Sequence, residues 1–412
     1  MTLTPRTALA VGAVALLALA LPLAVVALLF AALAVTVAVD IALVRRQPDV
    51  VRSVSPIVVR GVPAELSLET TAAGRVRLRQ PRPVDVEIEP GQADGRLGAT
   101  LVARRRGRHV LPAPAIRSTG PLGLGAWTHR AGEPAALTVY PDLPGARRLA
   151  AAVRRGRLWE EGQRRGPIGI GTEFESVRDY LPDDDIRHVN WRAAARLGRP
   201  MSNQFRVERD RDVMCVVDCG RLMAAPAGAG TRLDAAIDAA VAVAAVAEEL
   251  GDRCGVLAFA GAPLRAMAPR RRGTGAVLHA LHDLEPVAVD SDYDAAFRRV
   301  AGSKRAFALV LTDVLDEAAA RPLLAALPVL ARRHTVALAT VTDEELTELV
   351  HAEPGRKLDV YRAAVALDVL AARRRTVAQL RHAGADVIEA PAGALPAACV
   401  RAYLRAKSRG QL

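Results

Sequence analysis

Two aspartates that follow apolar runs are the residues with the clearest capacity for chemistry. Asp218 follows the run Val213–Val217, and Asp313 lies two residues after the run Phe307–Leu311. In an open α/β sheet, ligands bind outside the carboxyl ends of the strands, so both carboxylates should lie in one crevice. Carboxylate oxygens and water are the ligands that hard divalent cations prefer. The pattern therefore indicates a candidate cation site.

Other patterns that carry catalysis are missing from the sequence. The loop with Gly166, Gly169 and Gly171 has neither the preceding apolar strand nor the following lysine of a phosphate-binding loop. There is no nucleophile-elbow serine and no metalloprotease helix motif. His279 and His282 stand three residues apart, but no third well-placed metal ligand accompanies them. The sequence thus favours a binding protein without a cofactor over an enzyme.

The two aspartates belong to a region in which strand-like and helix-like segments alternate. After Val213–Val217, the strand candidates are Cys254–Phe259, Phe307–Leu311, Thr335–Val341 and Val387–Ile388. Helical segments separate them, at Gly275–Leu284, Asp294–Val300, Glu317–Leu330, Leu358–His382 and Leu395–Ala406. Such alternation is typical of a parallel sheet with helices on both faces. We therefore expect residues 213–412 to form one doubly wound, Rossmann-like α/β domain.

The amino-terminal part is typical of a membrane anchor. Ala8–Val39 contains no charged residue, and a single helix of this length would measure about 48 Å against a hydrocarbon core of roughly 30 Å. Because proline cannot donate a helical hydrogen bond, a break near Pro22 would give two shorter helices. Arg6 and Arg45–Arg46 flank the run and favour the cytoplasm. Residues 1–47 are thus predicted to form a transmembrane hairpin of a multi-pass cell-membrane protein with a cytoplasmic body; a single tilted helix is the alternative.

Between the anchor and the α/β region, the residue pattern changes twice. Residues 48–141 alternate apolar and polar side chains, as in Glu65–Glu69 and Val76–Arg79, which predicts a small antiparallel β-sandwich. Residues 142–212 are rich in arginine and glycine. The net charge of +12 raises the question of nucleic acid, but arginines alternate with acidic residues and aromatic residues make up only 3%, which argues against it. The four cysteines show no disulfide or zinc spacing and are expected to be reduced.

The densest motif lies in residues 171–196. It resembles the signature of the bacterial domain-of-unknown-function 58 family, carried here by Gly171, Glu173, Phe174, Arg178, Tyr180, Asp184, Arg187, Trp191 and Arg196. A second match to this family is the Pro-Leu-Gly-Leu turn within Gly120–Leu124. Charges of both signs with aromatic anchors predict a lid that is braced by ion pairs and packs on the α/β domain. The alternative is an active site built on Asp183–Asp185.

The segment Asp218–Leu222 resembles the metal-ion-dependent adhesion site of von Willebrand factor type A domains, which use Asp-x-Ser-x-Ser, a threonine and a second aspartate. By position, Asp218 matches the first aspartate and Asp313 the second, and Thr274 is the candidate for the threonine. Gly220 and Leu222 replace both serines, so two hydroxyl ligands are lost. We therefore expect weak or no Mg²⁺ binding, with Asp218 instead fixing its loop or capping a helix.

The two resemblances together imply a function. They imply a membrane-anchored, non-enzymatic protein that binds a MoxR-type AAA+ ATPase in assembly or chaperone-like work on membrane or envelope systems. The loops Asp218–Met223, Arg270–Thr274 and Asp313–Asp316 are expected to form much of the contact surface. The alternatives are a divalent-metal-dependent hydrolase that uses Asp218 and Asp313, and an outward-facing receptor that binds its ligand through a metal at the same residues.

Overall fold

The computed structural model describes residues 2–71, 74–156, 168–181, 184, 186–206, 210–313 and 317–409, without the side chains of 168–175, 187 and 204–206. The chain divides into two compact units, Met1–Tyr140 and Pro141–Leu412. Both combine helices with sheets, and many of the strand pairs are antiparallel. The predicted mixed α/β character of the chain is therefore confirmed.

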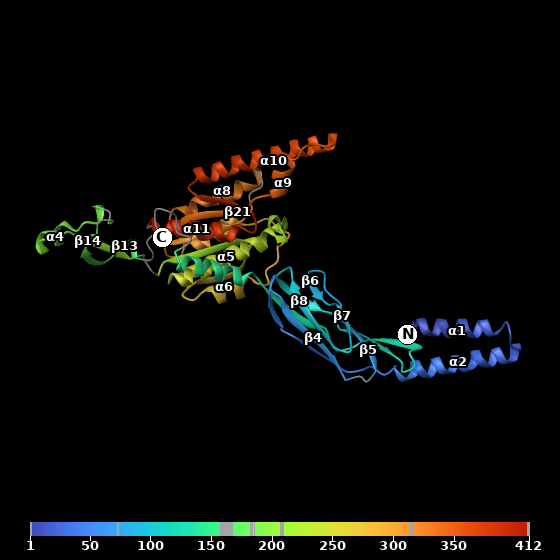
Figure 1. Cartoon of the computed structure of the whole chain (residues 1–412). Coiled ribbons are helices and arrows are strands. Elements are labelled where there is room, and N and C mark those ends of the chain that lie inside the picture. Colours follow the sequence, from blue (N-terminus) through green and yellow to red (C-terminus); the bar gives the residue numbers. More distant parts are fainter. Residues whose placement is uncertain are drawn as a thin grey trace. The chain divides into compact units, whose positions relative to one another are not determined.

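The first unit begins with two antiparallel helices, which lie side by side in Figure 1. Helix α1 covers Pro5–Leu17, and α2 covers Leu23–Leu43 with Pro22 as its N-cap. The helical run is therefore interrupted next to Pro22, as predicted. Helix α2 has 21 residues and a mean hydropathy of 2.6, whereas α1 has 13 residues. In the described part of the chain, α2 alone is long and apolar enough to cross a membrane, an observation in favour of membrane association.

The strands of the first unit form mainly antiparallel sheets with the orders β1-β11-β10-β5-β7, β2-β4-β8-β6 and β3-β12-β9. Alternate side chains, among them Leu66, Leu68, Leu78 and Leu101, point into one shared apolar core, as the period-two pattern requires. The strands are β1 (Thr2–Leu3), β2 (Val50–Val54), β3 (Ile57–Val59), β4 (Ala64–Thr70), β5 (Arg75–Arg79), β6 (Val86–Glu89), β7 (Gln92–Asp94), β8 (Leu97–Ala103), β9 (Gly107–Leu111), β10 (Ala115–Thr119), β11 (Gly125–Arg130) and β12 (Ala135–Tyr140).

The second unit is built on a six-stranded sheet with the order β19-β18-β15-β20-β21-β22. Neighbouring strands are parallel except β19, which runs antiparallel to β18 at one edge. The carboxyl ends of β15 and β20 therefore meet at one edge of the sheet, as predicted. The strands are β15 (Asp212–Asp218), β18 (Arg253–Phe259), β19 (Pro263–Arg270), β20 (Ala306–Leu311), β21 (Thr335–Val341) and β22 (Asp386–Ala390).

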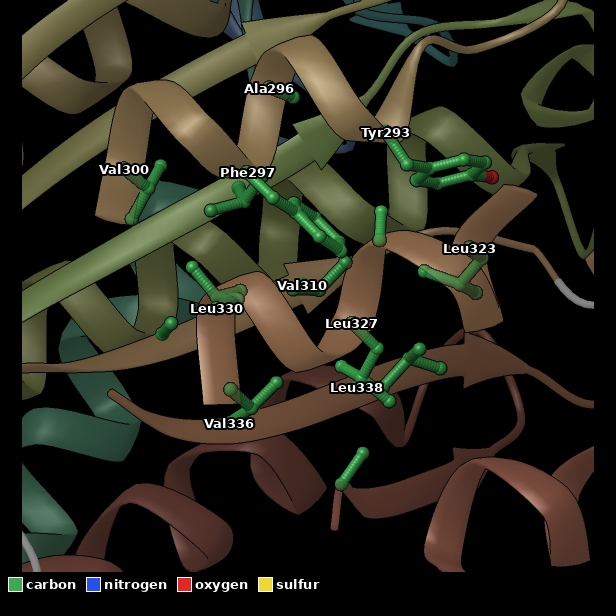
Figure 2. Packing of buried hydrophobic residues seen from close by; sticks show 14 of the residues in the cluster. Tyr293, Ala296, Phe297, Val300, Val310, Leu323, Leu327, Leu330, Val336 and Leu338 are labelled. Carbon is green, nitrogen blue, oxygen red and sulfur yellow. The ribbon is translucent and has the colours of Figure 1, made fainter. Parts of the chain in front are cut away.

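Helices cover both faces of this sheet. On one face, side chains of α7, α8 and α10 pack on alternate strand residues such as Val310, Val336 and Leu338 (Figure 2). Helices α5, α6 and α11 contact the sheet from the other side, and α5 is buried over most of its length. The helices are α3 (Leu143–Arg154), α5 (Arg232–Glu249), α6 (Thr274–Leu281), α7 (Tyr293–Ala301), α8 (Glu317–Ala331), α9 (Glu344–His351), α10 (Lys357–His382) and α11 (Leu395–Ser408).

The second unit has two smaller elements. The family signature forms an antiparallel pair, β13 (Ile168–Asp179) with β14 (Met201–Arg206), joined through the short 3-10 helix Ile186–His188 and helix α4 (Trp191–Leu197). After β15, the chain forms a 3-10 turn at Arg221–Ala224 and the two-residue strands β16 (Pro226–Ala227) and β17 (Gly230–Thr231), which lead into α5. Asp218 and Arg232 are thus held at the two ends of one short connection.

Candidate functional site

The carboxylate of Asp218 lies at the end of β15 and is 1% exposed. Its Oδ1 accepts hydrogen bonds from the Gly220 amide at 2.7 Å and from the Ser291 hydroxyl at 2.5 Å. Its Oδ2 accepts from Thr312 Oγ1 at 2.6 Å and from the Tyr293 hydroxyl at 2.9 Å. Four donors thus bind one buried carboxylate, which compensates the loss of its hydration.

Burial, with the nearby Asp218 carboxylate, raises the pKa of the Tyr293 hydroxyl. The phenol therefore stays protonated and donates at neutral pH. Its oxygen also lies 2.9 Å from Thr312 Oγ1, so the two hydroxyls and the carboxylate form one closed network. The network fixes the loop after β15, which is the role that the sequence left open for Asp218.

The backbone at Gly220 explains why a serine is missing there. A Cβ at this position would lie 2.1 Å from Ser291 Oγ and 3.1 Å from Asp218 Oδ1. Ser291, from the loop before α7, supplies its hydroxyl to Asp218 in the space that a side chain at Gly220 would need. A hydroxyl from a distant part of the chain thus approaches Asp218 where the adhesion-site pattern places a local serine.

The second carboxylate is paired with a cation from the protein itself. Asp313 forms an ion pair with Arg232, the first residue of α5, and both side chains are nearly fully buried. Thr340 Oγ1 donates to Asp313 Oδ1 at 3.2 Å, and the guanidinium of Arg373 lies 3.8 Å from the same oxygen. Asp343 lies 3.4 Å from Arg232 on the outer side. A guanidinium therefore balances the charge that a bound cation would balance in an adhesion site.

These donors do not fit a divalent cation. The described partners of Asp218 are all hydrogen-bond donors, and Arg232 places a positive charge on Asp313. Among the residues that the structure describes, no group of three or more His, Cys, Asp or Glu side chains is arranged to hold a metal ion. Magnesium needs an almost complete octahedron of oxygen ligands. Weak or absent Mg²⁺ binding stays our prediction for this site.

The structure does not bring Thr274 to the two aspartates. Strand β19 runs back along β18, with Arg270 opposite Cys254 at the start of β18, so the chain returns to the amino end of the sheet before α6 begins. There the Thr274 amide donates to Glu248 at 3.1 Å. Thr274 is thus wrong as the third ligand. For the same reason, the loop Arg270–Thr274 cannot share one contact surface with Asp218–Met223.

Several residues of the site were missed by sequence reasoning. They are Arg232, Ser291, Tyr293, Thr340 and Arg373, which reach the carboxyl edge from separate helices, loops and strands. Thr312 had a local signal, because it stands between a strand and Asp313. The other five are common residue types, and their spacing along the sequence does not relate them to Asp218 or Asp313.

A pocket opens beside the Asp218 network. It has a volume of about 260 Å³. Its lining comes from the loop after β15, the loop before α7 and the first turns of α8, and consists of Arg221, Leu222, Val289, Asp290, Ser291, Tyr293, Ala318, Ala319 and Pro322. Arg221 and Asp290 form an exposed ion pair at 2.5 Å among these residues. The carboxyl edge thus offers a small concave surface whose polar floor is already occupied by internal hydrogen bonds. Of the loop Asp313–Asp316, the last three residues lie outside the described part.

Within the described residues, the family signature forms a local network of hydrogen bonds and ion pairs. Arg178 binds Asp184 through two hydrogen bonds of 2.8 and 2.6 Å, and the Tyr180 hydroxyl donates to the Asp184 carbonyl at 3.0 Å. Asn190 caps α4 by accepting from the Ala193 amide at 3.0 Å. Trp191, expected as a packing anchor, is 70% exposed, and no other residue of α4 is buried; that part of the prediction is wrong. Arg196 is exposed as well.

Some signature residues lie outside what the structure describes. The backbone of β13 includes Gly171, Glu173 and Phe174, but their side chains and that of Arg187 are not described. Asp183 and Asp185 also lie outside the described residues, so the acidic cluster Asp183–Asp185 has no geometry to report.

The second family motif fastens the helix pair to the β-sheets of the first unit. Asp40, near the end of α2, accepts hydrogen bonds of 2.9 and 2.8 Å from the amides of Leu122 and Leu124 in the Pro-Leu-Gly-Leu turn, and one of 2.9 Å from the amide of Gly125, which begins β11. A Cβ at Gly120 would lie 2.2 Å from the Asp40 carboxyl carbon. The turn therefore needs glycine so that its amides can approach the carboxylate.

Comparisons with known proteins bear on the second unit. Residues 176–377 match the family described as "Protein of unknown function DUF58". An uncharacterized protein of Mycobacterium bovis, Mb1516, is 28% identical over 218 residues, which is 49% of this chain and 68% of that protein. Its counterpart Rv1480 of Mycobacterium tuberculosis gives the same values. A cohesin module from a Clostridium perfringens family 33 glycoside hydrolase covers 22% of this chain and 96% of that module at 12% identity, with a TM-score of 0.16, too low to support an argument.

Proposed function

We propose that this chain, whose residues 176–377 match the DUF58 family, is a membrane-anchored, non-enzymatic protein that binds a MoxR-type AAA+ ATPase. The ATPase partner is what the family resemblance implies, in assembly or chaperone-like work on membrane or envelope systems. The observation that carries the non-enzymatic part is the buried pair of Arg232 and Asp313 beside the fully hydrogen-bonded Asp218. The two aspartates that the sequence proposed for chemistry are thus engaged by hydrogen-bond donors and by a guanidinium of the protein itself.

The proposed architecture of the second unit is a doubly wound domain of the von Willebrand factor A type. Two observations support it: parallel strands in the order β18-β15-β20-β21-β22 and helices on both faces. In such sheets the functional edge is the carboxyl edge. The partner-binding surface is therefore assigned to the loop with Arg221 and Leu222 and to the pocket next to it.

The proposed placement is a two-helix membrane anchor with the body in the cytoplasm. Helix α2 has the length of a crossing, and α1 runs back beside it in Figure 1. Arg6 in the first turn of α1 and Arg45–Arg46 after α2 put positive charge at the same end of the pair, and positively charged flanks favour the cytoplasmic side. Phosphatase and fluorescent-protein fusions after Arg46 test this: phosphatase activity there would overturn it.

The partner proposal is tested by co-purification of the full chain from native membranes. Ala319 is exposed and lines the pocket, so Ala319→Trp should block it, and recovery of the ATPase should fall at least tenfold. Ala325→Trp is the matched control, because Ala325 is exposed on the same helix but does not line the pocket. Equal loss in both variants, or no AAA+ protein with the wild type, would contradict the proposal.

Metal binding by the same purified protein distinguishes the proposed function from the two metal-dependent alternatives. If the chain were a hydrolase or a metal-dependent receptor, Mg²⁺ or Mn²⁺ would bind with micromolar affinity, and Asp218→Ala would abolish binding. We expect no such binding in calorimetry. If a substrate screen showed turnover that depends on Asp218, together with metal binding, the proposed function would be wrong and the chain would be a metal-dependent hydrolase.

A further inference from the structure

An apolar groove runs along the helix pair of the first unit. Its volume is about 740 Å³. Helices α1 and α2, strand β1 and strand β11 line it, through Leu3, Thr7, Val11, Phe30, Leu33, Ala34, Val37, Ala38, Ile41, Ala42, Arg45 and Trp127. All but three of these side chains are aliphatic or phenyl groups. A hydrocarbon ligand therefore matches the walls.

The shape of the groove follows from the spacing of small residues on α2. Phe30, Ala34, Ala38 and Ala42 lie four residues apart, so they share one side of the helix. The three methyl groups leave a hollow between the Phe30 ring and the Arg45 side chain. Phe30 and Ala42 are twelve residues apart, which is about 18 Å of helix, and Arg45 follows just beyond the end of α2 at Leu43. That length exceeds the depth of one leaflet, about 15 Å of a 30 Å hydrocarbon core. The hollow thus has the length for one acyl chain.

One end of the groove is cationic. The Arg45 guanidinium lies 5.9 Å from the centre of the Trp127 ring, and Arg6 and Arg46 are exposed at the same end of the helix pair. Within the described part of the chain, these three arginines form no ion pair with a carboxylate. The nearby carboxylate, Asp40, is held by three backbone amides. The end that follows α2 therefore attracts an anion.

We infer that this groove binds one acyl chain of an anionic phospholipid, with the phosphate on Arg45 and the Trp127 ring at the level of the headgroup. Tryptophan favours the membrane–water interface, and anionic lipids concentrate in the cytoplasmic leaflet. A guanidinium binds phosphate through charge-assisted hydrogen bonds. In a zwitterionic lipid the headgroup cation balances the phosphate charge, whereas in an anionic lipid that charge is left for the arginine, so an anionic lipid is favoured. The inference rests on the membrane-anchored part of the proposed function.

The groove is tested on the full chain in mild detergent, by mass spectrometry of the lipid retained after washing and re-addition of phosphatidylglycerol or phosphatidylcholine. Ala38→Phe fills the hollow and should lower retained phosphatidylglycerol at least tenfold. Ala32→Phe, on α2 but outside the groove lining, should retain as much as the wild type. Equal retention in both variants would show annular lipid only and overturn the inference.

The headgroup contact is tested by a second pair of variants. Arg45→Gln should reduce the preference for phosphatidylglycerol over phosphatidylcholine about tenfold, because the unbalanced negative charge of phosphatidylglycerol loses its guanidinium partner. Arg46→Gln removes the same charge one residue later and should leave the preference unchanged. If both variants lose the preference for phosphatidylglycerol equally, the preference comes from the overall positive charge of this end rather than from Arg45, and the inference is refuted. If the chain is absent from the membrane fraction, the membrane anchor of the proposed function is refuted as well. If the ATPase still co-purifies but Ala38→Phe and Ala32→Phe retain equal amounts of lipid, only the lipid site is refuted.

Discussion

The variant Arg232→Met measures how strongly the buried ion pair supports the α/β unit. Methionine keeps an unbranched apolar stem of similar reach and removes the guanidinium. Of its partners in the described part of the chain, Asp313 then keeps Thr340 at 3.2 Å and Arg373 at 3.8 Å. The second oxygen of Asp313 accepts no hydrogen bond from any described residue. The variant therefore leaves a buried carboxylate with little compensation.

The expected loss follows from burial. Removing one partner of a buried ion pair costs about 3–5 kcal/mol. Because Arg373 still faces Asp313, we expect the lower end of this range. With a denaturant slope of about 3 kcal/mol per M urea for a unit of this size, the unfolding midpoint should fall by about 1 M.

The assay uses the cysteines as reporters. All four cysteines of the chain, Cys215, Cys219, Cys254 and Cys399, are free, buried and in the second unit. A short pulse of a thiol reagent across a urea series, read by mass spectrometry, therefore follows the unfolding of this unit alone.

Two controls make the reasoning refutable. Arg221→Met removes an exposed arginine whose ion pair with Asp290 is at the surface, and such pairs contribute about 0–1 kcal/mol. The double variant Arg232→Met with Asp313→Leu removes both charges and should recover at least half of the loss, since apolar replacements of a buried pair are often neutral. A midpoint shift under about 0.3 M, or additive losses in the double variant, would refute the assigned role of Arg232.

Three further predictions concern pH, the membrane end and the altered adhesion-site motif. Burial lowers the pKa of His334 below its ordinary 6.5, so at acidic pH the unfolded chain binds a proton that the folded chain does not bind. The free energy of unfolding should therefore fall as pH drops below about 6.5, by at most about 1.4 kcal/mol per pH unit. His334→Gln should flatten this slope in the thiol-pulse assay. Asp40→Ala removes the acceptor of three amides in and beside the turn. These amides should then exchange hydrogen about 10–100-fold faster, as measured by mass spectrometry. Unchanged protection would contradict the role of Asp40 in holding the turn to α2. Gly220→Ser should cost about 1–3 kcal/mol by its collision with Ser291, should be relieved by Ser291→Gly, and should not produce a Mg²⁺-dependent rise in Tm.

Much of the fold follows from local patterns. The uncharged run with Pro22 predicted two helices with a break between them, and α1 and α2 are separated by residues 18–22. Period-two alternation predicted β4 and β5 to within one residue at each end. Apolar runs such as Val213–Val217 predicted β15, and the alternation with helices predicted the parallel pairing. Backbone hydrogen bonding and side-chain periodicity act over a few residues, so the sequence contains this information directly.

The resemblance to the DUF58 family was also recognisable from sequence, because the motifs that carry it are contiguous. The match to DUF58 over residues 176–377 confirms the resemblance seen in the signature. The Pro-Leu-Gly-Leu turn was visible too, but its contact was not. Its partner, Asp40, lies about eighty residues earlier and inside an apolar helix, where a single carboxylate has no local signal.

The tertiary structure alone decided which side chains meet at the carboxyl edge. Asp218 and Asp313 were predicted together because parallel strands end at one edge, but the antiparallel turn of β19 carried Thr274 to the opposite end. Arg232 and Ser291 reach the two carboxylates from loops and helix starts whose positions depend on how α5 and α7 pack on the sheet. A buried carboxylate must find donors or a counter-charge wherever the packed chain offers them. That choice is made by distances across the folded unit, which spacing along the sequence does not contain.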